Sequence, residues 1–131
     1  MKKLTRSTII IAIALVVLYA IGRTLPKTEQ AYPRMRAAAT AFELEGVADG
    51  VYEGKAFLLP VSVRVRATVA GGRISAIELL RHFNGQGKPA EAILDEVIAA
   101  QSLGVDVVAG ATHSSLTILS AIEDALEKGK L

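Results

Sequence analysis

Cysteine and tryptophan are absent from the 131 residues of this chain, and only two histidines occur. Without cysteine the chain forms no disulfide, holds no iron–sulfur cluster through thiolates and attaches no haem through a C-x-x-C-H motif. A lipid-modified N-terminal cysteine is excluded for the same reason. Two histidines do not make a metal site, because zinc sites use three or four protein ligands. Any redox chemistry therefore needs another kind of cofactor.

Aromatic residues are scarce, at 5% of the chain, and the charge is unevenly distributed. Residues 1–45 contain seven Lys or Arg and three Asp or Glu, whereas residues 46–131 contain eight and ten. The net charge of +2 thus comes from the N-terminal third, and the remainder is slightly acidic. No basic face with interleaved aromatics occurs, so the sequence argues against a nucleic-acid partner. No pattern of a Ser-His-Asp triad, paired catalytic carboxylates or a Walker loop is present.

Charge is also lacking between Arg6 and Arg23, where sixteen uncharged residues follow one another. As a helix this stretch spans about 24 Å at about 1.5 Å per residue, which is short for a hydrocarbon core of about 30 Å. The flanking arginines can extend toward the two surfaces and make up the difference. Residues 1–23 are therefore predicted to form an uncleaved signal anchor. Since Lys2 and Lys3 precede its uncharged span, we expect the N-terminus to stay in the cytoplasm.

A cleaved signal peptide is the alternative interpretation of this segment. Its best cleavage site follows Ala20, but Leu18 occupies a position where a small residue is preferred. The predicted orientation is opposed by basic residues after the span, namely Arg23, Lys27, Arg34 and Arg36. We expect a single-pass protein of the cytoplasmic membrane with its domain on the extracytoplasmic side.

Residues 24–48 are interpreted as a connector, punctuated by Pro26 and Pro33, with a short helix over Met35–Leu44. The domain is expected over residues 49–129. Alternation of apolar and polar residues over Val61–Val69 predicts a strand with one solvated face. Together with strands at Val51–Phe57 and Arg73–Leu80, and a Gly71-Gly72 hairpin turn, it predicts an antiparallel meander.

Two helices are expected to follow these strands. After a loop over residues 81–88, Pro89 suits the first turn of a helix that continues to Gln101. A second helix is predicted from about Ser114 to Lys128, and Gly129 ends it. Its buried stripe is Leu116, Leu119, Ile122 and Leu126. The predicted fold class is α+β: a small antiparallel sheet packed by two helices and preceded by one N-terminal transmembrane helix.

Small and hydroxyl residues directly precede the second predicted helix. Gly110 allows the backbone to approach a ligand closely. The helix start beyond it offers unpaired N–H groups and the positive end of the helix dipole. Thr112 adds a hydroxyl that can bind a phosphate or be esterified by one. The stretch suits a phosphate, and an ordinary helix N-cap is the alternative.

The combined spacing of these and earlier residues resembles the small FMN-binding domain family. The residues that carry the resemblance are His82, Gly87, Ala90, Glu91, Ile93, Gln101, Val105, Asp106, Gly110, Ala111, Thr112, Ser114, Ser115, Ile118, Ala121, Glu123, Ala125 and Leu126. Related domains occur in subunits of sodium-pumping NADH:quinone oxidoreductase and of Rnf-type electron-transport complexes. The resemblance extends over residues 46–129.

The resemblance implies that FMN is attached covalently. In that family a Ser-Gly-Ala-Thr motif carries FMN on its threonine through a phosphoester bond, installed by a flavin transferase that takes FMN from FAD. The corresponding residue here is Thr112, with Gly110 and Ala111 giving the phosphate access to the backbone. Ala109 stands where the family usually has Ser or Thr, which removes one hydroxyl but leaves the acceptor.

Further cofactor-binding residues are expected around this motif. Ser114 and Ser115 are interpreted as caps of the helix and as donors to phosphate oxygens. Asp106 either binds backbone N–H groups in the turn or is recognised by the transferase. His113 is expected beside the cofactor or in solvent, and His82 as a hydrogen-bonding loop residue or a flavin contact.

Leu59, with its neighbours Phe57 and Leu58, packs either under the isoalloxazine ring or in the core. The sequence therefore predicts a membrane-anchored, extracytoplasmic flavoprotein that relays electrons, and it favours an electron-carrier domain or subunit of an oxidoreductase system over a stand-alone enzyme. Its redox partner is an unidentified protein or a quinone-linked donor. The alternative is a non-redox module derived from the same fold that binds a ligand or partner.

Overall fold

The computed structural model describes residues 3, 5–24, 28–83 and 88–131, in two compact units, Met1–Gln30 and Ala31–Leu131. Four residues used in the predictions above lie outside the described residues: Lys2, Pro26, Lys27 and Gly87. The first unit contains α1 (Arg6–Thr24), which is exposed along its length. It is long and apolar enough to cross a membrane, and a signal sequence has the same properties. The prediction of one N-terminal apolar helix is confirmed.

A second helix, α2 (Thr28–Ala41), begins seven residues before the predicted Met35. Pro33 does not prevent this, because it lies in the second turn and removes a single backbone hydrogen bond. From Ala31 onward α2 belongs to the second unit. There Ala39 is buried in the core, and Phe42 packs partly against it. This part of the predicted connector therefore contributes to the folded domain.

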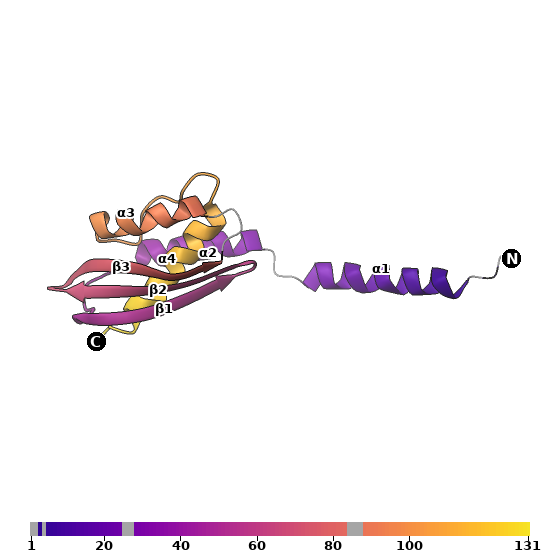
Figure 1. Cartoon of the computed structure of the whole chain (residues 1–131), viewed down its shortest axis with the longest axis horizontal. Helices are drawn as coiled ribbons and strands as arrows, with labels where there is room; N and C mark the ends of the chain where they lie inside the picture. The colour runs from indigo at the N-terminus through magenta and orange to yellow at the C-terminus, as the bar shows by residue number, and fades with distance from the viewer. Residues whose placement is uncertain (1–2, 4, 25–27, 84–87) are drawn as a thin grey trace. The chain divides into compact units, whose positions relative to one another are not determined.

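The sheet of the second unit contains β1 (Gly50–Leu58), β2 (Val61–Ala70) and β3 (Arg73–Phe83), in the order β1-β2-β3 and antiparallel throughout (Figure 1). The predicted meander is confirmed. Gly71 and Gly72 form the β2–β3 turn with φ of 62° and 73°, a conformation that favours glycine. The Asp49 carboxylate accepts their N–H groups at 3.0 Å (Gly72) and 2.9 Å (Gly71), which lowers its pKa.

Strand β3 contains a bulge that the sequence did not reveal. Val65 pairs with Leu79 and Arg64 pairs with Arg81, so Leu80 is an extra residue on β3. The bulge interrupts the alternation of side chains, and the strand therefore continues past its predicted end at Leu80 to Phe83. His82 consequently lies in a strand, paired with Val63, and its assignment to a loop was wrong.

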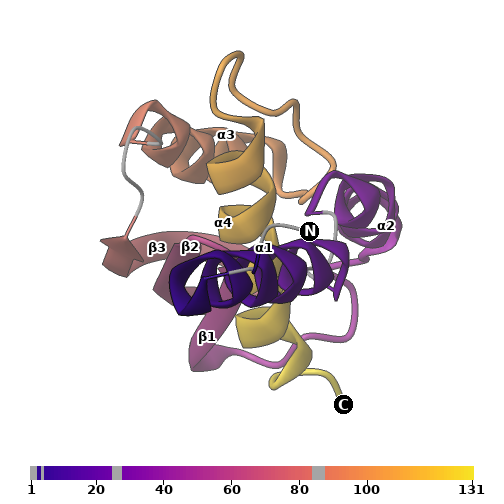
Figure 2. The same ribbon diagram turned by 90° about the vertical axis from the view of Figure 1, so that its right-hand side faces the viewer.

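One face of the sheet is covered by α4 (Thr112–Glu127), with η1 (Lys88–Ala92) and α3 (Ile93–Ala100) beside it (Figure 2). The expected first helix is thus a 3-10 turn, which contains Pro89, followed by an α-helix. The apolar side chains of β2, including Val63 and Val65, pack against α4 to form the core. Gly54 lets α4 approach β1, since a Cβ there would collide with backbone atoms of Ala121 and Ala125.

Gln101 joins α3 to the sheet. It ends α3 with φ of 50°, and its side-chain amide bonds both backbone groups of Ile74: Oε1 accepts from the N–H at 2.7 Å, and Nε2 donates to the carbonyl at 2.9 Å. Nε2 also donates to the carbonyl of Ile98 at 2.6 Å. The amide therefore acts as a short length of strand at the edge of β3.

Candidate functional site

A tight turn leads into α4. The N–H of Ala111 donates to the carbonyl of Val108 at 2.9 Å, and Gly110 within this turn has φ of 77°. A Cβ at Gly110 would meet no atom within 4 Å, so the space above this glycine is open. The conformation requires glycine, and the open space leaves its backbone accessible to a ligand.

The start of α4 presents backbone donors without protein acceptors. The first bond into the helix runs from the N–H of Ser115 to the carbonyl of Ala111 at 2.9 Å, and Ala111 at the N-cap provides no side-chain bond. In the part of the chain that the structure describes, the N–H groups of Thr112, His113 and Ser114 have no acceptor. These groups and the helix dipole favour an anion at this position.

Three hydroxyl side chains surround these donors in different roles. Thr112 is half-buried, and its hydroxyl makes no hydrogen bond to the described residues. Ser114 is 3% exposed, whereas the fully buried Ser115 accepts the N–H of Val108 at 3.0 Å. The expectation that the serines cap α4 was wrong, because the helix begins at Thr112 and Ser115 holds the preceding turn instead. Thr112 is left as the accessible hydroxyl at the helix start.

His113 links three segments of the domain. Its Nε2 lies 2.7 Å from the carbonyl of Leu58, and its Nδ1 lies 2.8 Å from the hydroxyl of Tyr32 in α2. Since a carbonyl can only accept, Nε2 carries the hydrogen, and in the neutral ring Nδ1 accepts from Tyr32. Both ring nitrogens are thus used by the protein. The His113 side chain therefore positions the helix start and has no free donor for a phosphate.

The bond between Leu58 and His113 brings the β1–β2 turn next to Thr112. Leu59 in this turn is 52% exposed, so its alternative placement in the core is wrong. An exposed leucine close to the helix start is available to cover a flat apolar ring. The structure thus gathers Gly110, Ala111 and Thr112 with Leu59 at one end of the sheet.

Two of the predicted site residues are engaged elsewhere. The side chain of His82 is 2% exposed and its Nδ1 lies 3.1 Å from a carboxylate oxygen of Glu91 in η1. Asp106 is fully exposed, and its carboxylate lies 3.9 Å from the guanidinium of Arg36. Among the described residues it makes no hydrogen bond to the turn before α4. Its remaining predicted role is recognition by another protein.

Sequence reasoning missed Tyr32 as a residue of the site. It precedes His113 by 81 positions and lies in the segment interpreted as a connector, so no local pattern relates the two. The contact also includes an edge-to-face arrangement of the rings, with centroids 5.8 Å apart. Glu91 carried a signal, since it is part of the motif that contains His82, but the sequence did not indicate their contact.

Comparison with known proteins relates this geometry to a family. The model of the FMN-binding domain matches residues 60–127. A protein of Treponema pallidum (strain Nichols), described as an uncharacterized protein, is 32% identical over 96 residues, which cover 71% of this chain and 27% of that protein. The chain thus spans about a quarter of the length of that relative. No solved structure matches the chain significantly.

The matched residues include the start of α4, and its donors fit the phosphate of FMN. Three N–H groups without acceptors among the described residues, the open backbone at Gly110 and the Thr112 hydroxyl are suited to bind a phosphate. The match also covers more than half of the chain. This chain belongs to the FMN-binding domain family and is a flavin-binding protein.

Proposed function

We propose that FMN is esterified to the hydroxyl of Thr112 and that the domain serves as an electron carrier. The proposal is carried by one observation: a helix start whose N–H groups lack acceptors adjoins a threonine hydroxyl that no described residue binds. Once attached, FMN accepts and passes on electrons, and the protein holds and shields it. The N–H groups of Thr112, His113 and Ser114 would hold the phosphate oxygens.

The attachment is a balanced phosphoryl transfer from FAD. The Thr112 oxygen bonds to the phosphorus on the FMN side, the pyrophosphate P–O bond breaks, AMP leaves and the hydroxyl proton is released. A flavin transferase is the proposed catalyst, because the described residues around Thr112 include no base that contacts its hydroxyl. His113 does not serve as that base, since its ring nitrogens are occupied by Tyr32 and Leu58.

We further propose that α1 anchors the domain in the cytoplasmic membrane, with residues 31–131 on the extracytoplasmic side. A covalent cofactor suits that side, because free FMN is scarce there and a reversible site would empty by mass action. Its redox partner is an electron-transfer protein or a quinone-linked donor. Protease added to spheroplasts should digest the domain. Protection until the membrane is lysed would overturn this orientation.

The ester is tested by intact mass and in-gel flavin fluorescence after co-expression with a flavin transferase. Wild type should gain the mass of one FMN, Thr112→Ser should retain some flavin, and Thr112→Ala should lose it. Thr112→Ala should still fold, since a residue at the helix start contributes at most about 1 kcal/mol through capping. Ser114→Ala is the matched control, because it removes the neighbouring hydroxyl and should remain flavinylated.

Two outcomes would contradict the ester. Covalent flavin on folded Thr112→Ala would show that another residue is the acceptor. An unmodified wild type beside a transferase that modifies a known substrate would favour a non-redox module that binds a ligand or partner. Ala109 supports that second function, because the hydroxyl usual at this position in the family is missing.

A further inference from the structure

The face of the sheet away from α4 has a separate charge pattern. Lys55 pairs with Arg64, and Arg64 pairs with Arg81, so three exposed cations form one row across the three strands. We call these three residues the cationic row. Neighbouring strands lie about 4.8 Å apart, so the row is about 10 Å wide. Like charges placed directly opposite destabilise a sheet, and the row therefore has a cost for folding.

The adjacent row on the same face shows how the protein neutralises such a charge. Arg66 lies between two carboxylates, with ion pairs of 2.8 Å to Glu53 and 3.0 Å to Glu78. No carboxylate among the described residues lies within ion-pair distance of the cationic row. The surface thus neutralises one arginine and leaves the next three cations for an external anion.

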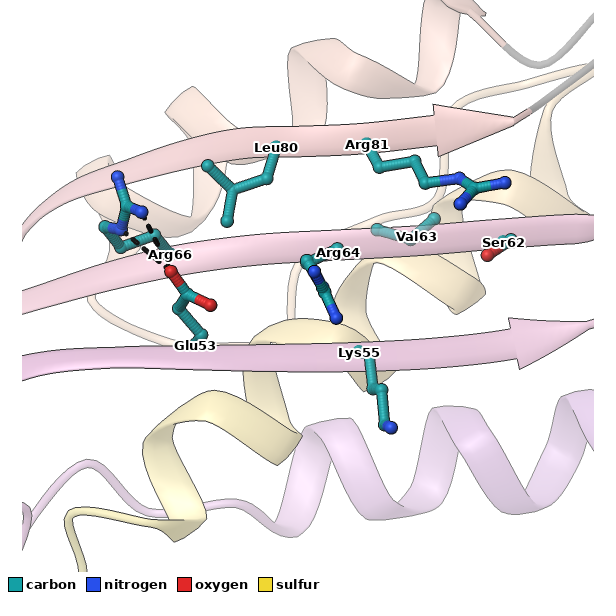
Figure 3. Close-up of a pocket in the computed structure, with 8 residues that line it drawn as sticks. All are labelled: Glu53, Lys55, Ser62, Val63, Arg64, Arg66, Leu80 and Arg81. Atoms are coloured by element: carbon teal, nitrogen blue, oxygen red, sulfur yellow. Dashed lines mark hydrogen bonds and ion pairs between the residues drawn. The ribbon is translucent and has the colours of Figure 1, made fainter.

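The bulge at Leu80 completes the cationic row. If Leu80 paired with Arg64 and no bulge formed, Arg81 would lie opposite Val63 and point into the core, because side chains alternate between faces. With the bulge, Arg81 shares the open face with Arg64 and Lys55, as Figure 3 shows. These side chains line a shallow concavity of about 460 Å³ together with Ser62, Val63, Leu80 and the Glu53–Arg66 ion pair. The cations are therefore arranged around a space that an anionic group can enter.

Exposed apolar side chains lie next to the cationic row. Phe57 and Phe83 flank Ser62 in the last row before the Leu58 end of the sheet, and they are 68% and 62% exposed. We call Phe57 and Phe83 the apolar tip. An apolar tip beside a belt of cations is the arrangement by which proteins contact the interface of anionic membranes.

We propose that this surface docks on the anionic phospholipids of the membrane that α1 spans, a proposal that rests on the membrane anchor proposed above. The cationic row would bind lipid phosphates, and the apolar tip would enter the interface between headgroups and acyl chains. The exposed phenylalanines beside the cations favour lipid over an acidic protein.

The hydrogen bonds at His113 show at which end of the sheet the chain enters the second unit. Tyr32, in the second turn of α2, binds His113, and His113 binds the carbonyl of Leu58. The chain therefore enters the second unit at the end of the sheet that carries Phe57 and Phe83. This end of the second unit is therefore the one at which the chain arrives from the proposed anchor.

The absence of cysteine allows a direct test. Ser62→Cys places one thiol between Phe57 and Phe83, and Thr68→Cys places one on the same face of the same strand, about 20 Å away. The full-length chain, labelled with an environment-sensitive fluorophore, is reconstituted into vesicles of phosphatidylcholine with or without phosphatidylglycerol. Spin-labelled lipids should quench the label at position 62 in the anionic vesicles and leave the label at position 68 bright.

Charge variants identify the residues responsible. Arg64→Gln and Arg81→Gln should each lower the ratio of docked to undocked protein about fivefold. High salt should also lower this ratio. Arg66→Gln is the matched control and should change little, since Glu53 and Glu78 already neutralise that arginine. Quenching that ignores headgroup charge would overturn the role of the cationic row.

Failure of docking and failure of the anchor give different results. If the chain is removed from vesicles by alkaline washing, the proposed anchor is wrong. If it remains but the labels at positions 62 and 68 are equally bright, lipid docking is overturned, and the cationic row would be left for an acidic protein partner. Flavin attachment to Thr112, measured by intact mass, is independent of either result.

Discussion

At the Gly71 end of the sheet, polar side chains hold the backbone together: Asp49 binds the hairpin turn, Gln101 binds Ile74, and the Tyr52 hydroxyl donates to the carbonyl of Ala48. At the Leu58 end, donors at the start of α4 have no acceptor among the described residues, and large apolar side chains such as Phe83 are exposed. The polar groups of the first end bind one another. The second end has backbone donors and apolar side chains that remain available to bind a ligand or a surface.

This difference separates the residues that stabilise the domain from those that bind. Unsatisfied donors and exposed apolar side chains lower stability unless something else covers them. The protein keeps them together at one end, which contains the proposed flavin site and the proposed lipid contact. Substitutions at the Gly71 end should therefore change folding, whereas substitutions such as Thr112→Ala should change binding and leave folding nearly intact.

The largest effect is expected at Gly54, where α4 approaches the sheet between the two ends. A Cβ in Gly54→Ala would collide with the backbone of Ala121 and Ala125, so α4 must move. We expect a loss of at least about 3 kcal/mol in the free energy of unfolding. Because α4 carries Thr112, flavin attachment should fall as well. Urea denaturation and intact mass measure the two effects, with Lys55→Ala on the opposite face as control.

A smaller loss, restricted to folding, is expected for Gln101→Ala. The substitution removes three hydrogen bonds and leaves the backbone groups of Ile74 without their partners, which should lower the free energy of unfolding by about 2–3 kcal/mol. The folded fraction should still be flavinylated at Thr112. Ser102→Ala, which removes one exposed bond to Gly104, is the control. Lost attachment in folded Gln101→Ala would contradict the separation of the two ends.

The smallest effect concerns Asp49 and depends on pH. Hydrogen bonds from the N–H groups of Gly72 and Gly71 lower the pKa of this carboxyl below its ordinary value of 3.8 in the folded state. A lowered folded pKa stabilises the protein above the unfolded pKa, and this contribution is lost as the pH falls through the folded value. Asp49→Asn should thus be slightly less stable at pH 7. Thermal denaturation should show the difference shrinking below about pH 4.

Regular alternation and turn chemistry made much of this fold predictable. The valines of β2 and the Gly71-Gly72 turn specify a meander by local rules, and the structure follows them. The start of α4 was placed two residues late, because Ser114 and Ser115 were interpreted as caps. That rule is statistical, and the Ser115 hydroxyl instead binds a residue seven positions earlier, Val108. Side chains with two possible backbone partners make helix starts ambiguous in sequence.

Features that depend on distant contacts could not be predicted. The partnership of Tyr32 and His113 exists only because α2 packs near the start of α4. The extra residue in β3 was also concealed, since Leu79 and Leu80 are both apolar and the sequence does not show which one leaves the alternation. Because the sequence does not reveal the bulge, it could not assign Arg81 to one face of the sheet. Of the cationic row, the sequence therefore assigned only Arg64, on β2, to the solvated face.

The extra residue at Leu80 also affects how relatives of this chain should be compared. A relative of the same length whose strand pairs without a bulge would align without a gap, with its arginine, histidine and phenylalanine in the same columns. Yet each of those side chains would lie on the opposite side of the sheet, because a strand has only two sides. A relative that lacks the extra residue would need a gap of one column, and its arginine would still lie opposite the residue equivalent to Arg64. Conservation of residues across this stretch therefore does not imply conservation of a surface.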